Sequence, residues 1–141
     1  MKATREILLK EKSLVTEVEQ FRNRFRNILD QSAESPETKP WKDFTMDLFR
    51  FQARANPVYR RFVELMGVVP SAVNSVEEVP FLPVELYQKQ RISVFQNSES
   101  DVHCFASSGT TGSSPSLHPV DDLDWYDEVA FEGFARLVIN W

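Results

Sequence analysis

The residues best suited to chemistry lie in a short uncharged segment. Between Asp101 and Asp121 the sequence has no Lys, Arg, Asp or Glu, and this span contains the run Ser107, Ser108, Gly109, Thr110, Thr111 and Gly112. Hydroxyls and backbone N–H groups in such a loop can donate to an anion, and glycine lets a phosphate approach the main chain closely. The loop is not a Walker A motif, because the required lysine is absent. A serine- and glycine-rich surface turn is the alternative interpretation.

The elements expected on either side favour a ligand loop over a linker. Apolar residues 102–106 predict a strand before it, and a helix is predicted to begin at Asp121 after it. A strand before and a helix after is an arrangement that holds nucleotide loops. Asp121, Asp122 and Asp124 crowd the start of that helix, where carboxylates interact favourably with free N–H groups. We therefore interpret them as capping residues and predict no metal site.

Four segments of the sequence together resemble a known family. FASSGTTGSSPSLH is similar to the phosphate-binding loop of adenylate-forming enzymes. The closest resemblance is to the acyl-protein synthetases, the fatty-acid-activating component of bacterial bioluminescence systems and its relatives, with phenylacetate–CoA ligase a more distant cousin. The similarity continues through FRFQARANPVYRRFVELMG, VPFLPVELYQ and HPVDDLDWYDEVAFEGF, so it covers about residues 41–141. The ordered set is more specific than the loop alone.

The resemblance implies an ATP-dependent acyl-activating ligase. ATP, with magnesium, and a carboxylic acid (a fatty acid in the closest relatives) would form an acyl adenylate, and the acyl group would pass to a thiol. Residues 107–112 would hold the β- and γ-phosphates. His118 follows the loop, where it would contact a phosphate or support the loop, with a structural hydrogen bond as the alternative. Ser116 stands where many superfamily members have lysine, and Tyr87-Gln88 where close relatives would have Phe-Lys.

The resemblance also implies that much of the enzyme is missing from this chain. The family's adenine-binding segment, magnesium ligand, ribose-binding aspartate and catalytic lysine would all lie beyond Trp141. No catalytic residue is therefore assigned. Hydrogen bonds to a charged group contribute about 1.5–3 kcal/mol each, while association costs roughly 4–15 kcal/mol. We expect an N-terminal fragment that is inactive alone and binds ATP weakly or not at all.

Apolar spacing predicts that helices dominate the first half of the chain. A stripe over residues 5–30 recurs every three or four positions, with Ser13 as a point where the helix could divide. A second helix is expected from Trp41, and a third between Asn56 as N-cap and Gly67 as C-terminal stop. The expected fold class is α/β and helix-dominated: an N-terminal helical extension over residues 1–40, then the first strands of an adenylate-forming enzyme's large domain over 41–141.

The middle of the chain is expected to be irregular, because prolines recur between residues 70 and 83. A short strand is predicted at Ile92–Phe95. Cys104, the only cysteine, lies in the apolar strand before the loop, and a small buried thiol is a better interpretation than a nucleophile.

Composition limits the kinds of partner. A formal net charge of −5 and a pI of about 5.1 argue against nucleic acid. No stretch resembles a signal peptide or a bilayer span, so we predict no membrane association and a cytoplasmic protein.

A non-catalytic helical interaction module is the competing hypothesis. The last helix carries an apolar stripe that ends at Trp141 without a stop signal. Further chain or another subunit would then cover it, and the fragment is expected to self-associate. In a module of this kind, the first and last helices would mediate dimerisation or bind a partner such as an acyl-CoA reductase.

Overall fold

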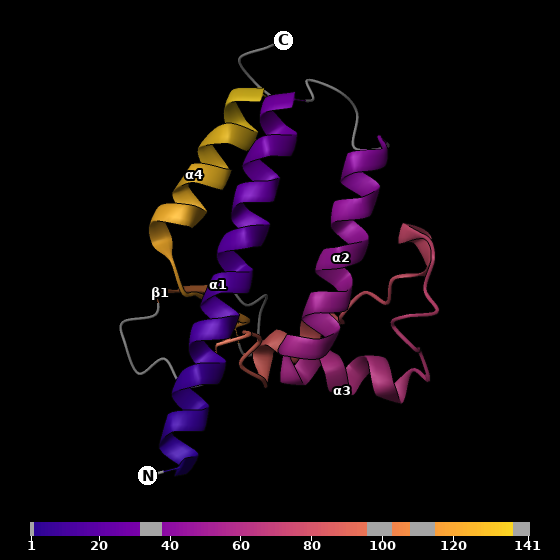
Figure 1. Ribbon diagram of the computed structural model, residues 1–141, viewed down its shortest axis with the longest axis vertical. Helices are drawn as coiled ribbons and strands as arrows, with labels where there is room; N and C mark the ends of the chain where they lie inside the picture. The colour runs from indigo at the N-terminus through magenta and orange to yellow at the C-terminus, as the bar shows by residue number, and fades with distance from the viewer. Residues whose placement is uncertain (1, 32–37, 96–102, 108–114, 137–141) are drawn as a thin grey trace. The chain divides into compact units, whose positions relative to one another are not determined.

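The computed structural model describes residues 2–31, 38–95, 103–107 and 115–136. By their contacts the residues divide into two compact units, Met1–Leu82 and Pro83–Trp141. Helices dominate the described chain, as predicted (Figure 1). The strands of the described residues form a small antiparallel pair. The elements in order are α1 (Lys2–Gln31), α2 (Lys39–Ala55), α3 (Pro57–Leu65), the 3₁₀ turns η1 (Val76–Glu78) and η2 (Val84–Gln88), β1 (His103–Ala106), β2 (Leu117–Val120) and α4 (Leu123–Phe134).

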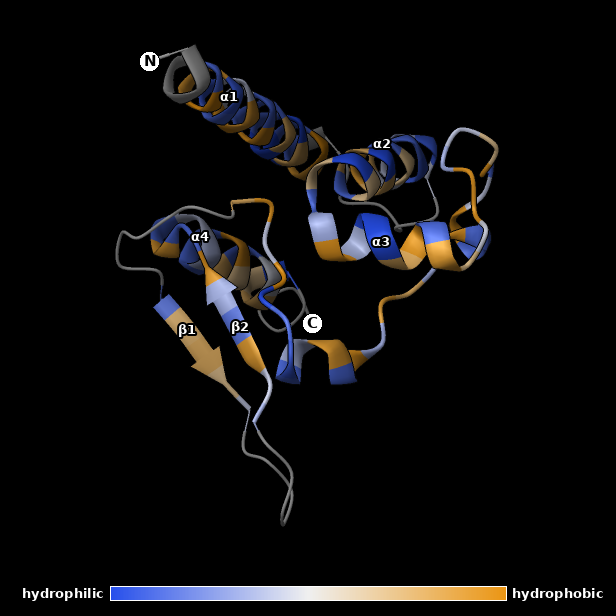
Figure 2. Cartoon of the chain, turned by 90° about the horizontal axis from the view of Figure 1, so that it is seen from below, coloured by the Kyte–Doolittle hydropathy of each residue, from blue (hydrophilic) through white to orange (hydrophobic). Residues whose placement is uncertain are grey.

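The predicted N-terminal helix is confirmed, and α1 runs unbroken through Ser13. Its amphipathic pattern is visible as alternating colours along the helix in Figure 2. The C-terminal half of the stripe packs on α2, where Phe21 contacts Phe51 with ring centroids 5.0 Å apart. Phe25 contacts Trp41 at 5.7 Å. The C-terminal half of α1 is therefore docked on α2 through aromatic side chains.

The N-terminal half of α1 extends past the end of its partner helix. Arg24 pairs with Asp47 at 2.6 Å, and Arg54, one residue before α2 ends, pairs with Glu17. The two helices are therefore antiparallel, and α2 ends opposite Glu17. Before that point Ile7, Leu8 and Leu9 keep 51%, 53% and 60% of their surface exposed.

The junction between α2 and α3 follows the sequence prediction in detail. Asn56 is buried, and its side-chain oxygen accepts from the N–H groups of Val58 and Tyr59, both at 3.2 Å. Pro57 occupies the first helical position, where its missing donor is not needed. Gly67 adopts φ of +69°, in the left-handed region that glycine enters without strain.

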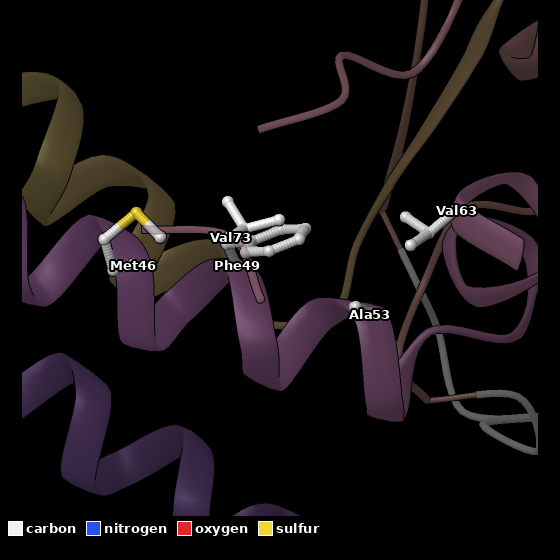
Figure 3. Packing of buried hydrophobic residues seen from close by; sticks show 5 residues of the cluster. All are labelled: Met46, Phe49, Ala53, Val63 and Val73. Atoms are coloured by element: carbon white, nitrogen blue, oxygen red, sulfur yellow. The ribbon is translucent and has the colours of Figure 1, made fainter. Parts of the chain in front are cut away.

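The core of the first unit lies between α2, α3 and the segment that follows them. Figure 3 shows Phe49 against Val73, with Met46, Ala53 and Val63 in the same cluster. Phe49 and Val63 are only 4% and 2% exposed. The hydroxyl of half-buried Tyr59 donates to the carbonyl of Pro80 at 2.7 Å, which fixes the proline-containing segment to this core.

The proline-rich middle of the chain is irregular, as predicted, apart from η1 and η2. The prediction of a strand at residues 92–95 is wrong, because the structure assigns no strand to this segment. Ser93 is buried there, and its hydroxyl oxygen accepts from the N–H of Phe95 at 3.0 Å. A side chain that bonds to nearby backbone offers an alternative to a strand ladder.

The second unit contains a β-hairpin followed by a capped helix. β1 confirms the strand predicted before the loop, while β2 was not predicted. They pair antiparallel, with Phe105 opposite His118 (Figure 2). The helix predicted at Asp121 begins at Leu123, and the Asp122 carboxylate caps it by accepting from the N–H of Trp125 at 3.0 Å. None of the described helices combines the length and hydropathy that a bilayer span requires.

Candidate functional site

The base of the predicted phosphate loop is closed by two hydrogen bonds. The N–H of Ser107 donates to the carbonyl of Ser116 at 3.0 Å, which extends the β1–β2 ladder by one pair. In return, the N–H of Ser116 donates to the side-chain Oγ of Ser107, also at 3.0 Å. The Ser107 hydroxyl thus accepts from the backbone and retains its own hydrogen for donation. The ends of the loop are therefore held together at a defined width.

The loop joins two strands rather than a strand and a helix. The sequence predicted a helix directly after the loop, but β2 intervenes, and α4 begins only after Asp122. The sequence did not predict β2 because the strand is only four residues long and contains Pro119, so it shows no alternation of apolar and polar residues. Of the predicted phosphate-binding residues, Ser107 is placed at the loop base. The other five, Ser108, Gly109, Thr110, Thr111 and Gly112, lie outside the described residues.

The two faces of the hairpin carry different side chains. Because side chains alternate along a strand, Phe105 and His118 share one face, and Ser107 continues that face towards the loop. Tyr126 of α4 stacks on Phe105 with ring centroids 5.0 Å apart. The opposite face carries Leu117, which is 48% exposed. The loop base thus adjoins an aromatic face, on which Phe105 is 45% exposed despite its stack, and an apolar face.

His118 is held by an aromatic stack that the sequence did not predict. The ring of Tyr87, in η2, lies 4.7 Å from the His118 imidazole with 26° between the planes. The contact joins two positions noted in the resemblance to acyl-protein synthetases: Tyr87, where close relatives would have Phe, and His118, which follows the loop. The structure thus shows a ring contact of His118, and its predicted role as a phosphate contact, a loop support or a structural hydrogen-bonding residue stays a prediction.

A second contact fixes the other end of β2. Asp121 accepts from the Ser93 hydroxyl at 2.8 Å, and its other oxygen lies 3.4 Å from Arg91. Sequence reasoning assigned Asp121 to helix capping, but its neighbour Asp122 provides the cap. No local pattern could have revealed the Ser93–Asp121 bond, because the two residues are 28 positions apart.

Cys104 corrects another expectation. The thiol was predicted to be buried, yet Cys104 is exposed, as is every residue of β1. The apolar composition of this strand predicted burial, but all four residues of β1 are exposed.

The part of the chain that the structure describes offers few side chains to a ligand near the loop base. In the portion of the chain that the structure describes, no group of three or more His, Cys, Asp or Glu side chains could hold a metal. At the loop base the Ser107 hydroxyl keeps its hydrogen for donation, whereas the N–H groups of Ser107 and Ser116 already bond across the base.

A separate groove of about 410 Å³ lies in the first unit between α1 and α2. Its charged lining residues already pair with one another: Arg54 with Glu17, and Arg50 with Asp47 at 3.4 Å. Arg50 also donates to the carbonyl of Val73 at 3.3 Å. Because these charges satisfy one another, the groove has the character of a helix interface rather than a ligand site.

Comparisons of the chain with protein-family models, with curated proteins and with solved structures found no match.

Proposed function

We propose that this chain is the phosphate-loop portion of an ATP-dependent acyl-activating ligase. The observation that carries the proposal is the base of the loop, where Ser107 and Ser116 join the ends of an uncharged Ser/Gly/Thr segment. The two hydrogen bonds fix where the segment between Ser107 and Ser116 begins and ends. By its sequence that segment is rich in hydroxyl and N–H donors, groups that bind phosphate oxygens. The resemblance of residues 41–141 to acyl-protein synthetases supplies the reaction class.

In the proposed reaction a carboxylate oxygen attacks the α-phosphorus of ATP. The bond between the α- and β-phosphates breaks, pyrophosphate leaves, and an acyl adenylate remains. A deprotonated thiol then attacks the acyl carbon, forming a thioester and releasing AMP. Residues 107–112 would bind the β- and γ-phosphates, orienting the α-phosphorus and stabilising the departing pyrophosphate. Magnesium, when bound, would neutralise phosphate charge. A fatty acid is the proposed carboxylic acid.

The test is ATP–pyrophosphate exchange by the protein that carries this chain, with fatty acids of graded length. Ser107→Ala should slow exchange by roughly 10- to 100-fold, because one hydrogen bond to a charged group contributes about 1.5–3 kcal/mol. Ser71→Ala, at an exposed serine in the first unit, serves as the matched control and should leave the rate unchanged. Absence of exchange with every acid would refute the proposed reaction.

The alternative function, a helical interaction module, is favoured by a separate observation. Ile7, Leu8 and Leu9 on α1 and Phe131 and Phe134 on α4 expose between 51% and 68% of their surface. Exposed apolar side chains gathered on helices are typical of interaction sites. Self-association of the chain or binding of an acyl-CoA reductase, without any pyrophosphate exchange, would favour the module over the ligase.

A further inference from the structure

The segment that precedes the hairpin holds β2 at two points. Tyr87 stacks on His118 near the start of the strand, and Ser93 bonds to Asp121 just after its end. Three residues of β2 are accordingly half-buried, whereas all four residues of β1 are exposed. β2 is therefore the anchored strand of the hairpin, and β1 is positioned mainly by pairing with it.

The Tyr87 contact lies close to the base of the loop. His118 is two residues from Ser116, whose N–H donates to the Ser107 hydroxyl. Ser116 is itself only 6% exposed, so the loop leaves β2 at a fixed point. A displacement of His118 would move β2 and with it the Ser116 N–H. The Tyr87 ring can therefore influence the position of the loop base through His118 and Leu117 of β2.

We propose that Tyr87 is a positioning residue for the loop base formed by Ser107 and Ser116. Its ring holds the imidazole of His118, which keeps β2 in register and maintains the Ser107–Ser116 hydrogen bonds. The relevance of this role to phosphate rests on the proposed function. The mechanical part, that Tyr87 stabilises the loop base, does not depend on any ligand.

Amide hydrogen exchange and NMR of the whole 141-residue chain test the mechanical part directly. In Tyr87→Ala, the His118 ring protons should lose the ring-current shift caused by the tyrosine. Exchange of the Ser107 and Ser116 N–H groups should accelerate by about two- to tenfold, the range expected when one aromatic pair is removed from a local opening equilibrium. Tyr87→Phe keeps the ring and should restore both signals.

Leu117→Ala is the matched control, because Leu117 lies next to His118 on the opposite, open face. It should leave the His118 ring-current shift in place and slow or accelerate exchange at Ser107 and Ser116 less than Tyr87→Ala does. Retention of the Phe105–Tyr126 ring-current shifts in Tyr87→Ala verifies that the unit is still folded. Unchanged exchange at both serines in folded Tyr87→Ala would overturn the proposal, as would failure of Tyr87→Phe to restore it.

Tripolyphosphate titration provides an independent arm. If wild type and Tyr87→Phe shift at the Ser107 amide with tripolyphosphate while Tyr87→Ala responds more weakly, positioning extends to ligand binding. If exchange depends on Tyr87 but no protein responds to tripolyphosphate, the positioning role holds and the phosphate assignment of the loop fails. The two ideas can therefore fail separately.

Discussion

At the scale of single residues, Asn56 and Gly67 delimit α3. The Asn56 side chain accepts two backbone N–H groups at the start of the helix, and Gly67 turns the chain away after its end. Both roles follow from local chemistry, because a cap needs a short acceptor and a left-handed residue needs no Cβ. These positions give the most direct mutational tests.

Asn56→Ala should lower the free energy of unfolding of the first unit by about 1 kcal/mol, within the 0.5–2 kcal/mol range of N-cap removals. The physical reason is that the N–H groups of Val58 and Tyr59 lose their acceptor. Asn56→Ser, which can still accept, should recover most of the loss. Urea denaturation followed by circular dichroism measures the difference, and equal stability of the alanine and serine variants would contradict the capping role.

The glycines at 67 and 133 should respond to alanine in opposite directions. A Cβ at Gly67 meets no atom within 4 Å, so its cost is conformational, about 1–2 kcal/mol for a residue held at positive φ. Gly133 is inside α4 and equally unobstructed, so Gly133→Ala should stabilise the helix by about 0.5–1 kcal/mol. Thermal unfolding of the two variants compares them, and the same sign for both would be inconsistent with the structure.

Tyr59 should make the first unit sensitive to alkaline pH. Burial raises the pKa of the Tyr59 hydroxyl, so the folded state favours the protonated form. This stability is fully present below the unfolded pKa, about 10, and is lost as pH rises through the higher folded value. Tyr59→Phe should cost about 1 kcal/mol at neutral pH, because the Pro80 carbonyl loses its donor, and the difference should shrink above about pH 10. Urea midpoints measured from pH 7 upwards check both parts, and a constant difference would argue against them.

At the scale of elements, α1 has two halves with different environments. The C-terminal half packs on α2 through aromatic contacts, while the N-terminal half extends beyond Glu17 with exposed apolar side chains. In proteins most helical stability comes from packing of an apolar face against other elements, so the packed half of this 30-residue helix should carry the stability.

The same substitution at two isoleucines of α1 tests this asymmetry. Ile28 is 7% exposed and Ile7 is 51% exposed. Ile28→Ala should destabilise the first unit by about 2–5 kcal/mol, the range for truncating a buried aliphatic residue, whereas Ile7→Ala should change stability by no more than about 0.5 kcal/mol. Chemical denaturation of the two variants gives the comparison. A large loss at Ile7 would mean that the N-terminal half is covered in solution.

At the scale of the whole molecule, the two units are stabilised by different kinds of interaction. The first has a buried cluster around Phe49 and Val63, while the second depends on ring stacks and a few hydrogen bonds around the hairpin. Two strands alone are marginally stable in water, so the second unit relies on its contacts with η2 and α4.

Residues 1–82 should therefore fold when expressed alone. The expected product is helical and unfolds cooperatively, because all the members of its buried cluster come from this segment. Val63→Ala within it should lower the unfolding midpoint, since Val63 is 2% exposed. Circular dichroism and thermal denaturation provide the measurement. A product without a cooperative transition, or one indifferent to Val63→Ala, would show that the first unit needs the rest of the chain.

Much of the helical architecture could be predicted from the sequence. The apolar stripe of α1, the Asn56-Pro57 start of α3 and the Gly67 stop depend on residues within one or two helical turns. The resemblance to acyl-protein synthetases also came from the sequence, and the ligase function and the phosphate role of residues 107–112 stay predictions. Ser107 is the one member of that loop whose position the structure describes.

The remaining features depend on contacts between residues far apart in the chain. Segment 92–95 has the composition of a strand, but Ser93 bonds to Asp121, and among the described residues the segment pairs with no strand. Cys104 has an apolar setting in the sequence yet is exposed, because burial depends on what other elements cover a strand. The Tyr87–His118 stack joins η2 to β2. Local sequence determines which backbone conformations are low in free energy. Strand pairing, burial and ring contacts between distant residues are decided only by the tertiary structure.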